Sequence, residues 1–137
     1  MQKLDLTNFE KVIILFEKMI LKNINNKKDI NNEESRLAII QSFEFAYEQS
    51  LKYIRRYLDI YHSEEYNNQM RMDIVIDFAY KMQITTFNSI EWEEVRKIRN
   101  NTSHDYAENN WNEFYPVAKK FAIEARFIYE QLKLKML

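Results

Sequence analysis

The chain has 137 residues and a formal net charge of −1 at pH 7, which is enough for one domain with a sizeable core and gives no overall positive field typical of a general nucleic-acid binder. Cysteine is absent and there are only two histidines, so a disulfide framework and a thiol nucleophile are excluded and a zinc site is not expected. The absence of glycine excludes a glycine-rich phosphate loop and, with a single proline, favours helices joined by short polar turns.

Periodic apolar residues predict the first helices in chain order. A first helix is predicted after Thr7 or Asn8, followed by a polar loop over residues 22–32. The second helix, from about Asn32 to Tyr61, should be the longest at roughly 45 Å. A third is predicted over residues 70–82, and its inward side chains are expected to be Met70, Ile74, Val75, Phe78 and Met82.

A fourth helix is predicted after Asn88, because Glu91 three residues later completes a capping-box pattern. Its inward stripe is apolar at first and then becomes polar, through Trp92, Val95, Arg99, Thr102 and Tyr106. Buried polar groups need partners, so we expect a site or an interface at the polar end. The last helix is predicted to start between Asn112 and Pro116, since proline is tolerated only in the first turn, and to continue to about Lys135.

These helices indicate one all-α domain over residues 1–137, most simply an up-and-down four-helix bundle with one accessory helix. No apolar run approaches the roughly 20 residues of a membrane span, and the N-terminus lacks the apolar core of a signal peptide. We therefore expect a cytoplasmic protein with no membrane association, no metal site and no cofactor.

The candidate site is the stretch from Arg99 to Tyr106, which contains one of the two histidines, His104. Five residues of helix correspond to roughly 500°, so Arg99 and His104 would point about 140° apart. Either the helix ends inside this stretch, or two copies of it meet across a symmetric interface. The simplest alternative is a helix end with a surface arginine and a polar cap.

A second group of basic residues falls on the second helix. Lys52, Arg55 and Arg56 stand at i, i+3 and i+4 and therefore share a face. Together with Arg96 they are candidate contacts for RNA or for a partner protein. A solvated charged face is the alternative interpretation.

Three passages resemble the nucleotidyltransferase substrate-binding protein family, a HepT-like branch of the HEPN superfamily. They are residues 4–11 (LDLTNFEK), residues 36–48 (RLAIIQSFEFAYE) followed by Lys52, Tyr57 and Leu58, and Trp92 with the motif Arg99-Asn100 through His104-Asp105-Tyr106. The order and spacing of these passages match the family over nearly the whole chain. One departure is Leu51, where many members have tryptophan; this affects core packing and leaves the motif intact.

The resemblance implies a HEPN-like homodimer in which two R-x-x-x-x-H motifs meet in a cleft, and a minimal nucleotidyltransferase as partner. In HepT-like pairs, the HEPN protein is a toxin and a metal-independent ribonuclease. Its partner silences it by transferring AMP to the motif tyrosine, here Tyr106. Carried over by position, Arg99 and His104 are catalytic and Asn100 is a supporting motif residue. In other members, the protein is a non-catalytic subunit that helps the transferase to hold its substrate or nucleotide.

The residue chemistry is compatible with RNA cleavage. Histidine titrates near neutrality and can act as a base or an acid, and arginine presents a fork of donors that matches phosphate oxygens. The intact motif favours the ribonuclease, whereas the near-neutral charge and the absence of a broad basic face favour the binding subunit. Whether the chain is an enzyme therefore stays open at this point.

Overall fold

A computed structural model describes residues 3–25, 33–101, 106–107 and 109–137, and in this part of the chain it contains five helices and no strand. The helices are α1 (Thr7–Asn25), α2 (Glu33–Tyr61), α3 (Met72–Lys81), α4 (Ser89–Asn100) and α6 (Trp111–Lys135). The all-α prediction is confirmed for these residues. None of the helices in these ranges is both long and apolar enough to cross a membrane.

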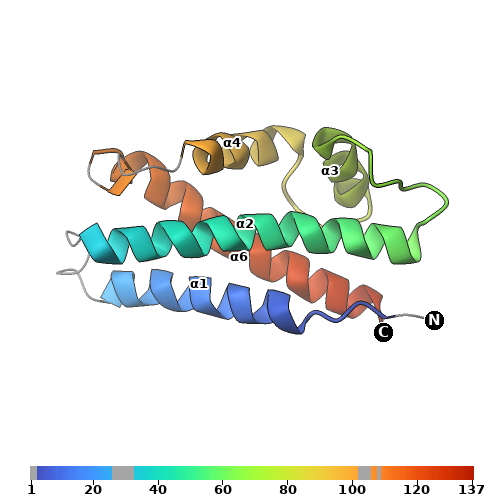
Figure 1. Ribbon diagram of the computed structural model, residues 1–137, viewed down its shortest axis with the longest axis horizontal. Coiled ribbons are helices and arrows are strands. Elements are labelled where there is room, and N and C mark those ends of the chain that lie inside the picture. The colour runs from blue at the N-terminus through green and yellow to red at the C-terminus, as the bar shows by residue number, and fades with distance from the viewer. Residues whose placement is uncertain (1–2, 26–32, 102–105, 108) are drawn as a thin grey trace.

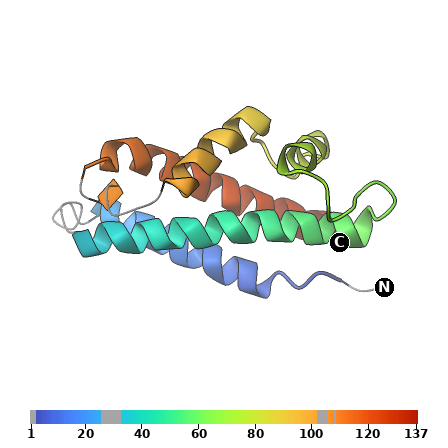
Figure 2. The same cartoon turned by 45° about the horizontal axis from the view of Figure 1, so that its top comes forward.

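The helices lie side by side along the long axis of the molecule (Figure 1). The chain direction alternates through α1, α2, α4 and α6, and α3 lies beside the start of α4. In both views α4 and α3 lie on the opposite side of α2 from α1 (Figures 1 and 2). The second helix is therefore the central element, with neighbours on both of its sides.

Aromatic side chains fill the core between α1, α2 and α6. Phe43 of α2 is fully buried and meets Phe16 of α1 and Phe114 and Phe121 of α6 in edge-to-face contacts, with ring centroids 5.2–6.2 Å apart. The indole ring of Trp92 also packs edge-on against Phe121, with centroids 5.5 Å apart. These contacts explain why α2 packs against α1 and α6, because large apolar rings at helical spacing bury most surface when they face the same core.

The capping box at the start of α4 is confirmed. The Asn88 side chain accepts a hydrogen bond from the backbone N–H of Glu91 at 2.9 Å, and the Glu91 carboxylate accepts one from the backbone N–H of Asn88 at 3.1 Å. Both hydrogen bonds satisfy backbone N–H groups that have no partner within the first turn of the helix. The boundary of α4 is therefore set locally by its own sequence.

Three expectations from the sequence need correction. The first helix extends to Asn25, beyond the predicted loop start at residue 22. The last helix begins at Trp111, which places Pro116 in the second turn, where its missing N–H removes one backbone bond without ending the helix. On α3, Ile74 is 46% exposed, and Ile76 and Ala79 are fully buried in its place. Val75, Ile76 and Ala79 stand at i, i+1 and i+4 and form the inward face of α3. Because residues 74–76 are all apolar, spacing alone could not show which of them face the core.

The connection from α3 to α4 is closed without glycine. Gln83 adopts a left-handed conformation with φ of 62°, and the N–H groups of Gln83 and Ile84 donate to the carbonyls of Tyr80 and Ala79 at 3.0 and 2.9 Å. This is the hydrogen-bond pattern of a Schellman C-cap, in which glycine normally occupies the left-handed position. The side chain of Ile84 is fully buried and fastens the connection to the core.

A buried carboxylate holds the rest of this connection. Glu124 of α6 is only 3% exposed, and its oxygens accept hydrogen bonds from the hydroxyls of Thr85 and Thr86 and from the backbone N–H of Thr86 at 2.8 Å. The Thr85 hydroxyl in turn accepts a hydrogen bond from the indole N–H of Trp92 at 3.1 Å. Neutral donors thus satisfy the charge, and they tie the connection and the first turn of α4 to α6.

We predict that Glu124→Gln lowers the free energy of unfolding by about 1–3 kcal/mol, because an amide cannot accept all of the bonds that the carboxylate accepts. Denaturant unfolding measures this change. The matched control is Glu130→Gln, on the exposed side of the same helix, whose ion pair with Arg126 is worth about 0.5 kcal/mol or less. Equal unfolding free energies for Glu124→Gln and the wild type would contradict the structural role of this carboxylate.

Candidate functional site

Arg99 lies in the last turn of α4 and reaches across to α2. Its Nη2 donates to the Glu48 carboxylate at 2.6 Å, and its Nη1 lies 3.5 Å from the Glu44 carboxylate. The side chain is 29% exposed. The hydrogen bond to Glu48 raises the pKa of the guanidinium; burial opposes this rise, and the negative charges of Glu44 and Glu48 reinforce it. Arg99 is therefore a fixed, fully charged group at the protein surface.

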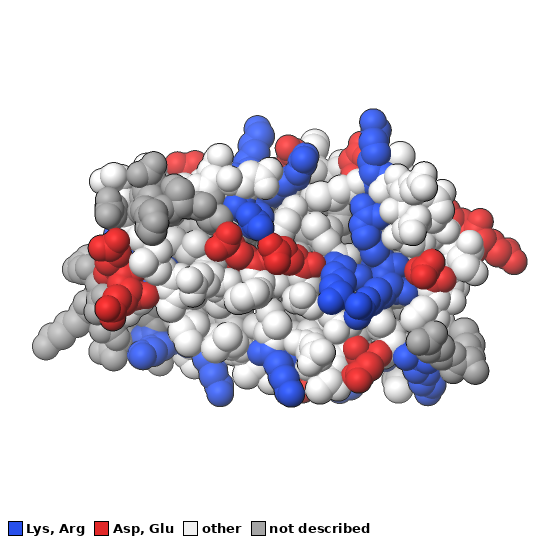
Figure 3. Space-filling view, in the orientation of Figure 1, with Lys and Arg blue, Asp and Glu red and all other residues white. Residues whose placement is uncertain are grey.

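The two carboxylates that hold Arg99 were not among the predicted site residues. Glu44 and Glu48 are one helical turn apart, so they share a face of α2, and Figure 3 shows an acidic group in the middle of the molecular face that it displays. The signal was present in the sequence as Glu-x-x-x-Glu within a helix. Nothing in the sequence indicated that α4 would pass beside this face of α2.

The motif continues beyond the end of α4. Asn100, the predicted supporting residue, is the last residue of the helix and is exposed. The helix thus ends inside the motif, one of the two arrangements that the spacing of Arg99 and His104 allowed. His104 and Thr102 lie outside the described residues.

Tyr106 is the last residue of the motif and is buried, with 4% of its surface exposed. Its ring stacks on Phe114, with centroids 5.5 Å apart and planes 26° apart. Burial raises the pKa of its hydroxyl, the negative charge of Glu113 adds to this, and a hydrogen bond with the Asn101 side chain opposes it. The phenol is therefore neutral near pH 7, with its ring packed against Phe114 and its hydroxyl bonded to the exposed Asn101.

Arg36 of α2 contacts the residues that follow the motif. Its Nη1 donates to the backbone carbonyl of Ala107 at 2.7 Å, and its guanidinium lies 5.0 Å from the centre of the Trp111 ring. Ala107 and Trp111 are themselves buried. The second helix therefore holds the chain on both sides of the motif, through carboxylates before it and through an arginine after it.

The predicted basic residues are divided between two hollows, and Arg99 lines neither of them. Lys52, Arg55 and Arg56 line one of about 320 Å³, and Figure 3 shows blue side chains gathered beside the acidic group. Arg55 donates to the Tyr66 hydroxyl at 3.3 Å and to the Met70 carbonyl at 3.1 Å, which gives it a structural task. Lys52 and Arg56 are exposed.

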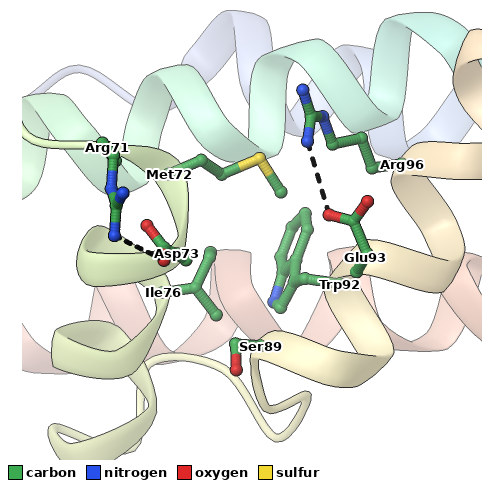
Figure 4. Close-up of a pocket in the computed structure, with 8 residues that line it drawn as sticks. All are labelled: Arg71, Met72, Asp73, Ile76, Ser89, Trp92, Glu93 and Arg96. Carbon is green, nitrogen blue, oxygen red and sulfur yellow. Dashed lines mark hydrogen bonds and ion pairs between the residues drawn. The ribbon is translucent and has the colours of Figure 1, made fainter.

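The second hollow lies between α3 and α4, has a volume of about 540 Å³ and includes Arg96 (Figure 4). Arg71 and Arg96 stand on opposite sides of it and pair with Asp73 at 3.2 Å and Glu93 at 3.4 Å. The side chains of Met72, Ile76 and Trp92 lie between them. Apolar surface flanked by two arginines suits a planar anionic ligand, although each arginine already has a carboxylate beside it.

The chemistry available at Arg99 is anion recognition. A guanidinium has five N–H donors in a planar fork, a geometry that matches the oxygens of a phosphate. Within the described residues, no group of three or more histidine, aspartate or glutamate side chains is placed to hold a metal ion.

Comparison with known proteins identifies the family. The family model for nucleotidyltransferase substrate binding protein like sequences matches residues 4–134. The curated protein "Probable ribonuclease HepT" from Haemophilus influenzae is 34% identical over 96 residues, which make up 69% of this chain and 64% of that protein. The match thus spans slightly less than two thirds of that relative's length, and no solved structure matches. The chain, from its first helix to its last, therefore belongs to the HepT-like family of nucleotidyltransferase substrate-binding proteins.

Proposed function

We propose that this protein is the HEPN toxin of a toxin–antitoxin pair, a metal-independent endoribonuclease that a minimal nucleotidyltransferase silences by AMP transfer. The observation that carries the proposal is Arg99, held by two carboxylates at the end of α4, directly before the stretch that contains His104. The name of the Haemophilus influenzae relative supports the same activity.

In the proposed reaction, the 2′-hydroxyl of a ribose attacks the adjacent phosphorus and expels the 5′-oxygen of the next nucleotide. His104 takes the proton from the 2′-hydroxyl or supplies one to the leaving oxygen, because imidazole titrates near neutral pH. Arg99 donates hydrogen bonds to the phosphate oxygens as negative charge accumulates on them. Asn100 supports the motif, and Lys52, Arg55, Arg56 and Arg96 contact RNA or the partner protein.

His104→Ala should reduce the cleavage rate of purified protein on RNA by roughly 10²–10⁴-fold without loss of the fold. Arg99→Ala should lose a comparable factor, on the order of 3–4 kcal/mol, and Arg99→Lys should recover little because an ammonium does not replace the planar fork. The matched control is Lys97→Ala, an exposed residue in the same turn of α4, which should cleave normally. Cleavage should also persist in EDTA.

Full cleavage by the His104→Ala protein would assign the activity to a contaminating nuclease and would favour the second candidate, a non-catalytic binding subunit of a two-component nucleotidyltransferase. The hollow between α3 and α4 supports that candidate, because Arg71 and Arg96 flank apolar surface there. Calorimetric titration with ATP separates the two functions. The binding subunit should bind ATP and lose affinity in Arg96→Ala, whereas a protein that acts only as the ribonuclease should bind no ATP in this hollow.

We further propose that the chain is a single HEPN-like domain over residues 1–137, an up-and-down four-helix bundle with α3 as its accessory helix, and that two copies form a homodimer. A dimer would let Arg99 and His104 of both chains converge on one phosphate. Phe45 supports a particular surface: it lies between Glu44 and Glu48 in the sequence and is 56% exposed. A large apolar side chain beside the candidate site is the kind of residue that a protein partner covers.

Light scattering at micromolar concentration should give about twice the 16.9-kDa mass of the chain. Phe45→Asp should shift the mass to that of the monomer, because the substitution would bury a charge in the interface. Ile123→Asp on α6 is the control and should leave the dimer intact, although Ile123 is 75% exposed and thus even more accessible. A monomeric wild type would contradict the dimer, and a dimeric Phe45→Asp protein would contradict this surface.

The proposed silencing acts on Tyr106. Its phenol oxygen attacks the α-phosphorus of ATP, a phosphodiester bond forms, pyrophosphate leaves and the phenol proton passes to a base. Because Tyr106 is buried against Phe114, the hydroxyl must turn outward before it can react. The added phosphate would then bring negative charge close to the motif, where it competes with RNA.

Incubation with the cognate nucleotidyltransferase and ATP should add the mass of adenylyl groups to the wild-type protein but not to Tyr106→Phe. Tyr115→Phe is the control, a partly buried tyrosine of α6 whose loss should leave the modification unchanged. Intact-protein mass spectrometry followed by peptide mapping gives the answer. Equal labelling of wild type and Tyr106→Phe would remove Tyr106 from the proposal.

A further inference from the structure

We propose that Lys52, Arg55 and Arg56 form a phosphate subsite of the ribonuclease, which binds the RNA backbone about two to four nucleotides from the cleaved bond. The subsite is the hollow of about 320 Å³ that these residues line. The proposal rests on the proposed function for the position of the cleaved bond. Binding of an RNA phosphate in the hollow is testable without any cleavage.

The two arginines of the subsite are oriented by neutral groups. Arg55 donates to the Tyr66 hydroxyl at 3.3 Å and to the Met70 carbonyl at 3.1 Å, one bond from each terminal nitrogen. The guanidinium of Arg56 lies over the ring of Tyr53, 5.4 Å from its centre. A neutral acceptor or an aromatic face holds a guanidinium in place without cancelling its charge.

The positive charges of the subsite also lack carboxylate partners. Within the described part of the chain, none of Lys52, Arg55 and Arg56 forms an ion pair. Asp59 lines the same hollow, but it pairs with none of the three. Four other arginines each pair with a carboxylate: Arg71, Arg96, Arg99 and Arg126. The charges in this hollow therefore remain available to an anion from outside the chain.

The lining of the hollow favours a phosphate over a protein partner. Its six described residues all carry a polar group, and none of them is aliphatic: Lys52, Arg55, Arg56, Asp59, Tyr66 and Asn68. The centre of a protein–protein interface is typically apolar and depleted in charged residues. The exposed Asn68 amide adds an uncharged donor beside the cations, which is a common contact for backbone phosphates.

The position of the subsite on α2 gives its distance from the cleaved bond. Lys52 follows Glu48 by one helical turn and Arg55 follows it by about two, so both continue the face that contacts Arg99. At 1.5 Å per residue, the three cations stand roughly 6–12 Å beyond Glu48 along the helix. A stacked strand advances about 3.4 Å per nucleotide, so RNA lying along α2 would cross this distance in about two to four nucleotides. Basic side chains lie beside the acidic group on the face in Figure 3.

The first experiment measures binding of a 2′-O-methylated oligouridylate by fluorescence anisotropy, because its blocked 2′-hydroxyl prevents cleavage. Lys52→Gln and Arg56→Gln should each weaken binding about fivefold, and the double variant by up to about 25-fold, the effect of unit charges about 4 Å from a phosphate in water. The slope of log affinity against log salt should become shallower by about 0.7 in the double variant, the value for one phosphate contact of a single strand. Arg55 is left unchanged because it holds the connection after α2.

The control is Lys18→Gln, which removes the same charge from an exposed lysine of α1. This helix lies on the opposite side of α2 from α4, so RNA affinity should stay at the wild-type value (Figures 1 and 2). All variants should melt at the wild-type temperature, since the changed side chains are exposed. Wild-type RNA affinity in the double variant would overturn the proposal, and so would an equal loss in Lys18→Gln.

The second experiment locates the subsite on cleavable RNA in which one phosphate is replaced by an uncharged methylphosphonate. At one position, about two to four nucleotides from the cleaved bond, the replacement should raise the wild-type KM by about the same factor as the double substitution. The value of kcat should stay unchanged, because a remote contact holds substrate and transition state equally. In the double variant, the replacement at this position should have no further effect. Equal effects in both proteins at every position would overturn the proposal.

The two experiments separate the subsite from the proposed ribonuclease. If the variants bind the methylated RNA more weakly as expected but no preparation cleaves RNA, the phosphate site stands and the ribonuclease function fails. If the double variant cleaves RNA with the KM of the wild type, the ribonuclease stands and the subsite is overturned.

Discussion

The arrangement of the candidate site depends on the buried carboxylate of Glu124. A charge in an apolar interior is strongly unfavourable unless hydrogen bonds replace its hydration, and here two threonine hydroxyls and backbone N–H groups do so. Because these donors all belong to the connection before α4, their bonds hold the start of α4 against α6. The hydrogen bond from the Trp92 indole N–H to the Thr85 hydroxyl then fixes the rotation of α4 about its own axis. Arg99 stands two helical turns further along, and its direction follows from this anchor.

The long helix α2 is the second determinant of the site. It supplies Glu44 and Glu48 to Arg99 before the motif and Arg36 to the Ala107 carbonyl after it. One helix therefore contacts the chain directly before and directly after the part of the motif that lies outside the described residues.

The charged side chains form small local groups, although the net charge of the chain is only −1. Acidic side chains gather in the middle of one face and basic side chains lie next to them (Figure 3). Arg55 is committed to the connection after α2, and Arg71 and Arg96 are paired with neighbouring carboxylates. The positive charge is thus distributed in small groups that neighbouring carboxylates and carbonyls orient, and it does not form one continuous field on the face shown.

The sequence by itself determined the features that depend on neighbouring residues along the chain. Apolar periodicity identified α1, α2, α4 and α6, and Asn88 with Glu91 marked the start of α4, because helix stripes and caps are set within one or two turns. The three matching passages identified the family. Only the tertiary structure decided which carboxylates meet Arg99, that Tyr106 is buried, that Ile76 and not Ile74 faces the core, and that Glu124 is an anchor. These contacts join residues that are far apart in sequence or choose among equally apolar neighbours, so they depend on how the helices pack and not on any local pattern.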